Sequence, residues 1–298
     1  MNLKGKNILI LGLGISGVST AKALDRLGAK IIINDSKEKK DLDKYISQIN
    51  DIEAKWYLGT NQISLESIDL IVKSPGIPPT QDIIKEAKGR GIEIVTDLEL
   101  AYRIKPNGKF IAITGTNGKT TTTTLTGEFF RKAGFSTHII GNIGVGILWD
   151  ALNSQKDSIF VVEASSFQLE NTTKFAPQIS LILNITPDHL NWHGSLENYI
   201  NAKKKIFKNQ KEDRYTILNY DDPLLNAMGD DVNANLIWFS VNDILPKGVY
   251  IKDRYIVIND GQSMEKVLPI DKIKMLGKHN LQNALASVAI GWIMGLDI

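Results

Sequence analysis

The chain has 298 residues, of which 43% are hydrophobic, enough for two domains of ordinary size with a core in each. Its 35 Lys and Arg residues nearly balance 33 Asp and Glu residues, so the charge gives no reason to expect a nucleic acid or a membrane surface as a partner. The absence of cysteine excludes disulfides, thiolate metal sites and a cysteine nucleophile.

The N-terminus carries lysines before an apolar stretch, as a signal peptide does. Its glycines follow the spacing of a binding loop, however, and the chain continues directly into an amphipathic helix. No apolar stretch reaches the roughly 18 residues that a membrane span needs. We therefore expect a cytoplasmic protein, with no membrane or nucleic-acid partner, and a monomer.

A glycine-rich loop follows the first predicted strand, Asn7–Leu11. The loop, Gly12 to Gly17, fits the pattern G-x-G-x-x-G; a helix is predicted over 18–27, and a second strand over 31–33 runs on to Asp35. This order predicts a dinucleotide-type βαβ unit, in which Asp35 meets a ribose or a base. The alternative is that the glycines only permit close packing of the strand and the helix.

A third predicted strand, 69–73, runs into a loop that contains three prolines and Gly76. Such a rigid loop lies at the carboxyl ends of the strands, where open α/β sheets bind their ligands. Turn residues at 105–108 then indicate a linker.

The second half of the chain starts with an apolar strand and the loop GTNGKT, from Gly115 to Thr120. Backbone N–H groups of such a loop converge on an anion, Lys119 adds a mobile positive charge, and the Thr120 hydroxyl suits Mg²⁺. The loop is not a standard Walker A motif, because that motif requires glycine where the chain has Ile113. It is either a variant phosphate loop or an ordinary strand–turn–helix connection.

Acidic and histidine residues follow the next two predicted strands. The strand 158–162 leads to Glu163, and an acid beside a phosphate loop usually holds Mg²⁺ or its water; the alternative is a glutamate that stabilises a helix N-terminus. The strand 179–185 leads into a loop that contains His189 and His193. At the carboxyl end of a central strand, a histidine can equally be a binding-site ligand or a surface residue that only makes hydrogen bonds.

The C-terminal third contains short β-like runs over 232–270, which predict a small antiparallel extension without an assigned function. At the start of the last predicted helix, the side-chain amides of Asn280 and Asn283 could bind a purine, although either could simply cap the helix.

These elements predict an α/β protein with two domains. Residues 1–97 would form a Rossmann-like domain with a parallel sheet. Residues 98–298 would form a P-loop-type α/β ATPase domain with the small antiparallel extension.

In chain order, the segments GLGISG, SPGIP, TGTNGKTT, GNIG, E-x-SSFQLE, TPDHL-x-x-HGS, Y-x-x-AK and GKHN-x-x-N resemble the Mur ligase family. The resemblance runs from end to end of the chain, and SSFQLE and the first glycine loop with Asp35 are most similar to the D-glutamate-adding members. It implies an ATP-dependent ligase of peptidoglycan synthesis. In that reaction ATP phosphorylates UDP-N-acetylmuramoyl-L-alanine, and the amine of D-glutamate attacks the acyl phosphate.

The resemblance also implies roles for individual residues. The implied catalytic residues are Lys119, His189 and Lys203, with Lys203 carbamylated. Two Mg²⁺ ions are implied, held by Thr120, Glu163, His189 and the modified Lys203. The implied ATP-binding residues are Gly115, Thr116, Asn117, Gly118, Lys119, Thr120, Thr121, Asn280 and Asn283. The implied UDP-substrate residues are Ser16, Asp35, Gly76, Asn142 and His189.

The sequence departs from the family pattern in two ways. Asn191-Trp192 replaces the usual Asp-Arg, which puts the salt bridges expected near His189 in question. The family's third, D-glutamate-binding domain would begin about where this sequence stops, so we expect that this chain alone does not ligate.

Three other functions stay open at this stage. An NAD-dependent oxidoreductase would account for the first glycine loop and Asp35 but not for the second loop, Glu163 or His189. A non-catalytic UDP-sugar or nucleotide-binding module would fit a chain without the third domain. Another Mur ligase would use a different amino acid.

Overall fold

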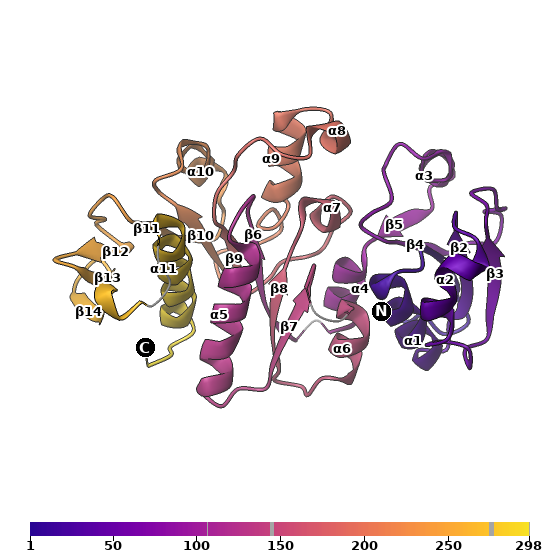
Figure 1. Cartoon of the computed structure of the whole chain (residues 1–298), viewed down its shortest axis with the longest axis horizontal. Coiled ribbons are helices and arrows are strands. Elements are labelled where there is room, and N and C mark those ends of the chain that lie inside the picture. The colour runs from indigo at the N-terminus through magenta and orange to yellow at the C-terminus, as the bar shows by residue number, and fades with distance from the viewer. Residues whose placement is uncertain (106, 144–145, 274–276, 298) are drawn as a thin grey trace. The chain divides into compact units, whose positions relative to one another are not determined.

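The computed structural model describes residues 1–105, 107–143, 146–273 and 277–297 (Figure 1). It confirms the α/β class and contains two sheets. The chain divides into two compact units. Unit 1 comprises Met1–Asn107, Gly144–Ser154 and Phe167–Phe175, and unit 2 comprises Gly108–Ile143, Gln155–Ser166 and Ala176–Ile298.

The domain border between residues 97 and 98 stays a prediction. Pro106 of the predicted linker and Gly144 of the GNIG segment lie outside the described residues. Within the described part of the chain, no helix is both long enough and apolar enough to cross a membrane.

Unit 1 contains a five-stranded parallel sheet with the strand order β3-β2-β1-β4-β5. In the central strand β1, Leu9 lies opposite Ile32 on β2 and Ile71 on β4, and all three are buried. Such apolar runs are typical of parallel strands that are buried in a sheet. The elements of this unit are β1 (Asn7–Leu11), α1 (Ile15–Arg26), β2 (Lys30–Asp35), α2 (Lys39–Ile46), β3 (Ala54–Leu58), β4 (Leu70–Lys73), α3 (Asp82–Gly89), β5 (Glu93–Val95), α4 (Asp97–Ile104) and α6 (Ile147–Asn153).

Unit 2 contains a nine-stranded sheet with the order β14-β13-β12-β11-β10-β9-β6-β8-β7. Its elements are β6 (Lys109–Thr114), α5 (Lys119–Lys132), β7 (Thr137–Gly141), β8 (Ile159–Glu163), β9 (Ile179–Ile182), α8 (Leu190–His193), α9 (Leu196–Lys204), β10 (Tyr215–Asn219), α10 (Pro223–Met228), β11 (Asn235–Ser240), β12 (Gly248–Lys252), β13 (Tyr255–Asn259), β14 (Met264–Pro269) and α11 (Lys278–Ile293). The short helix α7 (Ser166–Leu169) spans the division between the units.

The antiparallel extension predicted over residues 232–270 is smaller than that range. Antiparallel pairing joins β12 to β13 and β13 to β14. Strand β11 pairs in parallel with both β10 and β12 and so continues the central sheet. The direction of a strand depends on its neighbours, which a short apolar run in the sequence does not reveal.

Helices α5 and α11 lie side by side on the sheet of unit 2 (Figure 1). Helix α5 contacts β6, β7 and β8, whereas α11 contacts β10 to β13. The hydroxyl of Thr126 on α5 hydrogen-bonds Ser287 on α11 at 3.2 Å inside this interface. The packing brings the start of α11 next to the loop that precedes α5.

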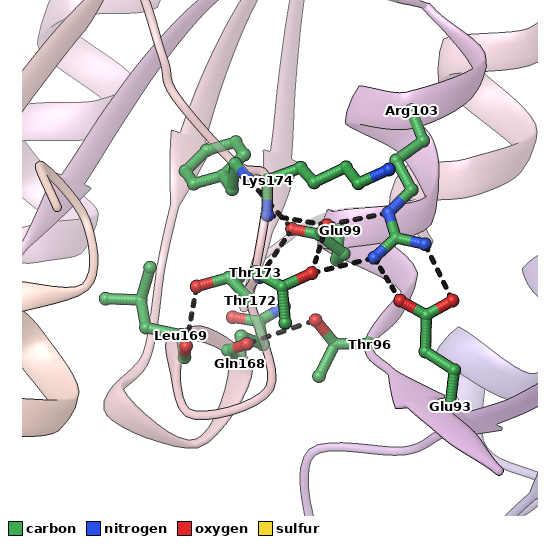
Figure 2. A network of polar contacts seen from close by, with 10 residues as sticks. Glu93, Thr96, Glu99, Arg103, Gln168, Leu169, Thr172, Thr173 and Lys174 are labelled. Carbon is green, nitrogen blue, oxygen red and sulfur yellow. Dashed lines mark hydrogen bonds and ion pairs between the residues drawn. The ribbon is translucent and has the colours of Figure 1, made fainter. Parts of the chain in front are cut away.

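A buried ion-pair network holds the segment Phe167–Phe175 in unit 1 (Figure 2). The carboxylate of Glu99 on α4 is inaccessible to solvent and accepts hydrogen bonds from the backbone N–H groups of Thr173, Lys174 and Phe175, at 2.9 to 3.2 Å. Arg103 donates to Glu99 at 2.7 Å, so the buried carboxylate has both a counter-charge and backbone donors.

We predict that Glu99→Gln destabilises the folded chain by about 3 kcal/mol, because it removes a buried charge from Arg103 and weakens three backbone hydrogen bonds. Urea denaturation followed by circular dichroism measures the change. The matched control is Glu86→Gln, which breaks an exposed pair with Arg90 and should cost less than about 1 kcal/mol. Equal effects of the two substitutions would contradict the prediction.

Candidate active site

The loop Gly115 to Thr120 joins β6 to α5 at the carboxyl edge of the unit 2 sheet. Gly118 has a φ of 82°, in the left-handed region that favours glycine. A Cβ at this position would lie only 2.4 Å from Oδ1 of Asn283 on α11. Glycine is therefore required here both by the backbone and by the close approach of α11.

Asn184, two residues after β9, fixes the first half of this loop. Its Oδ1 accepts hydrogen bonds from the backbone N–H groups of Thr116 at 3.1 Å and Asn117 at 2.8 Å, and its Nδ2 donates to the Asn117 carbonyl at 3.1 Å. The backbone carbonyl of Asn184 also accepts from the N–H of Thr116. This residue was not predicted from the sequence, although a polar side chain near the end of the apolar run ISLILNI could have indicated a role at the site.

Two lysine side chains converge on the Gly115 carbonyl. Lys119 donates to it at 3.0 Å and to the Thr116 carbonyl at 2.9 Å. Lys203 of α9 donates to the same Gly115 carbonyl at 2.8 Å. Burial lowers the pKa of Lys119, and the nearby Glu163 and Asp188 oppose that shift.

Lys203 is the most enclosed cation of the site, with 1% of its surface exposed. Its ammonium lies 4.6 Å from the ring centre of Tyr199, whose hydroxyl bonds Thr116 at 3.1 Å. Burial, and after it the positive charge of Lys119, lowers the pKa of Lys203 to about 7, and Asp188 opposes the shift. A substantial fraction of this amine is therefore neutral near pH 7.

Glu163 ends β8 and joins two of the predicted site residues. The hydroxyl of Thr120 donates to Glu163 Oε2 at 2.8 Å, and Asn142 Nδ2 donates to Oε1 at 3.0 Å. The carboxylate thus lies beside the first turn of α5, where Thr121 follows Thr120. Asn142, predicted to bind the UDP-substrate, contacts the predicted metal ligand Glu163 in this structure.

The donors beside α5 suit one Mg²⁺ ion. A carboxylate and a hydroxyl, completed by nucleotide phosphate oxygens and water, are ligands that Mg²⁺ prefers. Among the described residues, no group of three His, Cys, Asp or Glu side chains could hold a metal ion.

His189 lies in the loop between β9 and α8 in a left-handed conformation, with a φ of 52°. Its Nε2 is 3.5 Å from Oδ2 of Asp188, and its ring stands edge-on to Tyr199. The acidic group beside this histidine is therefore Asp188, its immediate neighbour in the chain. The histidine keeps this neighbour although Asn191-Trp192 replaces the Asp-Arg of the family. The second histidine, His193, is buried and bonds the hydroxyl of Ser166 at 3.0 Å.

Asn280 and Asn283 both lie in the first turns of α11, next to Gly118. Asn283 is buried and its Nδ2 is 3.4 Å from Oδ1 of Asn280. The residue at the N-cap position of α11 is Gly277, so neither asparagine occupies that position. Their position beside the phosphate loop suits a contact with the nucleoside of a bound nucleotide.

The remaining predicted residues, Ser16, Asp35 and Gly76, belong to unit 1. Asp35 Oδ2 accepts a hydrogen bond from the N–H of Leu13 at 2.7 Å, which ties the end of β2 to the glycine loop. Ser16 lies in the first turn of α1, and a Cβ on Gly76 would meet nothing within 4 Å. Gly17 supports the alternative that the glycines of this loop permit close packing, because a Cβ at this position would lie 2.3 Å from the Gly12 carbonyl oxygen.

Comparisons with known proteins agree with this arrangement. The domain described as Mur ligase MurD-like, N-terminal domain, matches residues 6–96, and the Mur ligase middle domain matches residues 113–291. The chain is 44% identical over 300 residues to UDP-N-acetylmuramoylalanine–D-glutamate ligase from Alkaliphilus metalliredigens and 42% identical over 299 residues to the protein of that name from Clostridioides difficile. Both matches cover 100% of this chain but 66% of the relative, so the chain spans about two thirds of their length.

Solved structures show the same fold at lower identity. A UDP-N-acetylmuramate:L-alanyl-gamma-D-glutamyl-meso-diaminopimelate ligase from Neisseria meningitides superposes with a TM-score of 0.64 at 18% identity, over 98% of this chain and 95% of that one. A UDP-N-acetylmuramate-alanine ligase from Thermotoga maritima gives a TM-score of 0.55 at 22% identity, over 98% and 66%. On the domain matches and the identity to these relatives, the chain belongs to the Mur ligase family.

Proposed function

We propose that the chain carries the UDP-substrate and ATP sites of a ligase that joins D-glutamate to UDP-N-acetylmuramoyl-L-alanine in peptidoglycan synthesis. The names of its relatives and the two domain matches support this assignment. The observation that carries it is the 2.8 Å contact between Thr120 and Glu163 at the start of α5. A hydroxyl and a carboxylate beside a phosphate loop suit nucleotide-bound Mg²⁺. The cytoplasmic location and the monomeric state stay predictions.

In the proposed reaction, the free carboxylate of the UDP-substrate attacks the γ-phosphorus of ATP, which gives an acyl phosphate and ADP. The amine of D-glutamate then attacks the acyl carbon and loses a proton, and inorganic phosphate leaves from the tetrahedral intermediate. Phosphoryl transfer of this kind depends mainly on positioning and on neutralisation of charge. Lys119 serves both needs when its ammonium turns from the loop carbonyls to the phosphate oxygens.

Other residues of unit 2 bind the nucleotide and its metal in this proposal. The N–H groups at the start of α5, from Gly118 to Thr121, face the phosphates. Gly115, Thr116 and Asn117 shape the loop around them, and Asn280 and Asn283 contact the adenosine. Thr120 and Glu163 hold one Mg²⁺, and His189 helps to hold a second; bound Mg²⁺ neutralises the charge of the phosphates.

Unit 1 supplies the UDP site in this proposal. Ser16, Asp35 and Gly76 bind the UDP end of the substrate, at the carboxyl ends of the parallel strands. Asn142 of unit 2 is assigned to the muramoyl end of the substrate. Its hydrogen bond to Glu163 would connect that end of the substrate with the metal site. No residue is assigned to D-glutamate.

We further propose that Lys203 is carbamylated. A neutral amine is the form that attacks CO₂: an N–C bond forms, one proton is released from the nitrogen, and the neutral amine becomes a carbamate anion. The lowered pKa of Lys203 favours the neutral amine, and the nearby Lys119 favours a negative charge over a positive one. The anionic group could then support the metal site.

Carbamylation predicts a carbamate carbon resonance in a ¹³C spectrum of the protein in ¹³C-bicarbonate. The resonance should be absent in Lys203→Met and retained in Lys204→Met, since Lys204 is more exposed and pairs with Asp231. A wild-type spectrum without it, or one in which Lys203→Met leaves it unchanged, would refute the modification.

The function is tested by calorimetric titration of the chain with UDP-N-acetylmuramoyl-L-alanine, with ATP and Mg²⁺, and with NADH. We expect the UDP-sugar and ATP to bind and NADH not to bind. Thr120→Ala should weaken ATP binding in the presence of Mg²⁺ and leave the UDP-sugar unaffected. Binding of NADH without binding of the UDP-sugar would instead identify an oxidoreductase.

A further inference from the structure

Lys73, the last residue of β4, is a buried cation in unit 1 to which neither the fold nor the proposed reaction assigns a role. Only 1% of its surface is exposed, which is rare for a lysine. Its ammonium donates to the carbonyl of Ile77 at 2.8 Å and to that of Ser74 at 3.3 Å. The two carbonyls bracket Pro75 and Gly76, so the lysine holds the chain of this loop on both sides of Gly76.

The same loop is attached to the glycine loop that precedes α1. The hydroxyl of Ser74 donates to the Gly12 carbonyl at 2.9 Å, and the N–H of Ser74 donates to the Leu11 carbonyl at 2.8 Å. A Cβ on Gly12 would lie 2.9 Å from the Ser74 side chain, so the two loops are in close contact. Lys73 and Ser74 together therefore fix Gly76 relative to the start of α1.

The charged groups around Lys73 come from several elements. Burial is the main cause that lowers its pKa to about 8; Glu170 and Asp97 oppose this shift, and Lys88 on α3 adds to it. Asp97 begins α4 and is itself buried, and burial raises its pKa. The ammonium of Lys73 is thus mostly charged at pH 7 and loses its proton over the next two pH units, after which its bonds to the carbonyls weaken.

We infer that Lys73 is a positioning residue for the UDP end of the substrate. It fixes the shape of the loop Ser74 to Pro79, which Ser74 attaches to the loop Gly12 to Gly17, so that a uridine diphosphate group at the start of α1 meets Gly76. This inference rests on the proposed function, because the UDP group is the ligand assigned to these loops. Lys73 itself needs no contact with the ligand, since it acts through Gly76.

The first test is the affinity of Lys73→Met for UDP-N-acetylmuramoyl-L-alanine, measured by calorimetry at pH 7. We expect a loss on the order of tenfold, as for a lost hydrogen bond to a charged donor, with ATP affinity unchanged. The matched control is Lys85→Met on α3, an exposed lysine that pairs with Asp82 and should bind as the wild type does. Equal affinities of Lys73→Met and the wild type would overturn the inference.

The pH profile separates positioning from a purely structural role. Because the charged lysine holds the loop, wild-type affinity for the UDP-sugar should fall as the pH rises from 7 to 9, through the pKa of about 8. Lys85→Met should show the same fall, whereas Lys73→Met should be flat. Lys73→Arg keeps its charge over this range, so it should retain more affinity than Lys73→Met and also lose the fall. A fall that persists in Lys73→Met would refute the inference.

Hydrogen exchange of the Gly76 and Ile77 amides provides a readout that needs no ligand. Faster exchange in Lys73→Met than in Lys85→Met supports the positioning of the loop, and equal exchange contradicts it. If the wild type does not bind the UDP-sugar at all, the proposed substrate is wrong, and the exchange data still decide whether Lys73 holds the loop. Failure of the function and failure of this inference are thereby distinguishable.

Discussion

Asn184 holds the loop Gly115 to Thr120 at the carboxyl edge of the unit 2 sheet, and the other site residues of this unit are placed around that loop. Its amide group satisfies two backbone N–H groups and one carbonyl in the first half of the loop. The first N–H groups of α5 have no partner within the helix and can therefore face an anion. A side chain from the segment that follows β9 thus fixes a loop that lacks the first glycine of a Walker A motif.

Two lysines share one backbone carbonyl of this loop. The Gly115 carbonyl accepts from both Lys119 and Lys203, and burial lowers the pKa of each lysine. Two cations on one carbonyl repel each other, and a phosphate group would be a stronger partner for Lys119. A carbamate on Lys203 would turn the repulsion into attraction. The same geometry therefore favours both the movement of Lys119 and the modification of Lys203.

The sequence was sufficient for features that depend on local pattern. The predicted strand Asn7–Leu11 has the bounds that the structure shows. The loop before α5 and the acid at the end of β8 were also predictable, because each directly follows an apolar run that is typical of a strand. Asn184 could not be assigned in this way, because its role arises only once β9 lies beside β6. Glu99 is a similar case, since its backbone donors are more than 70 residues away in the chain. The parallel direction of β11 also depends on its neighbours rather than on its own residues.

The central claim is that the loop held by Asn184 is an ATP site. The most direct measurement is the calorimetric affinity for ATP with Mg²⁺ of the wild type, Asn184→Ala and the control Thr124→Ala, whose side chain is exposed on α5. The account predicts that the wild type binds, that Asn184→Ala binds about tenfold more weakly, and that Thr124→Ala is unchanged. A wild type that does not bind ATP, or an Asn184→Ala variant that binds it equally well, would contradict the account.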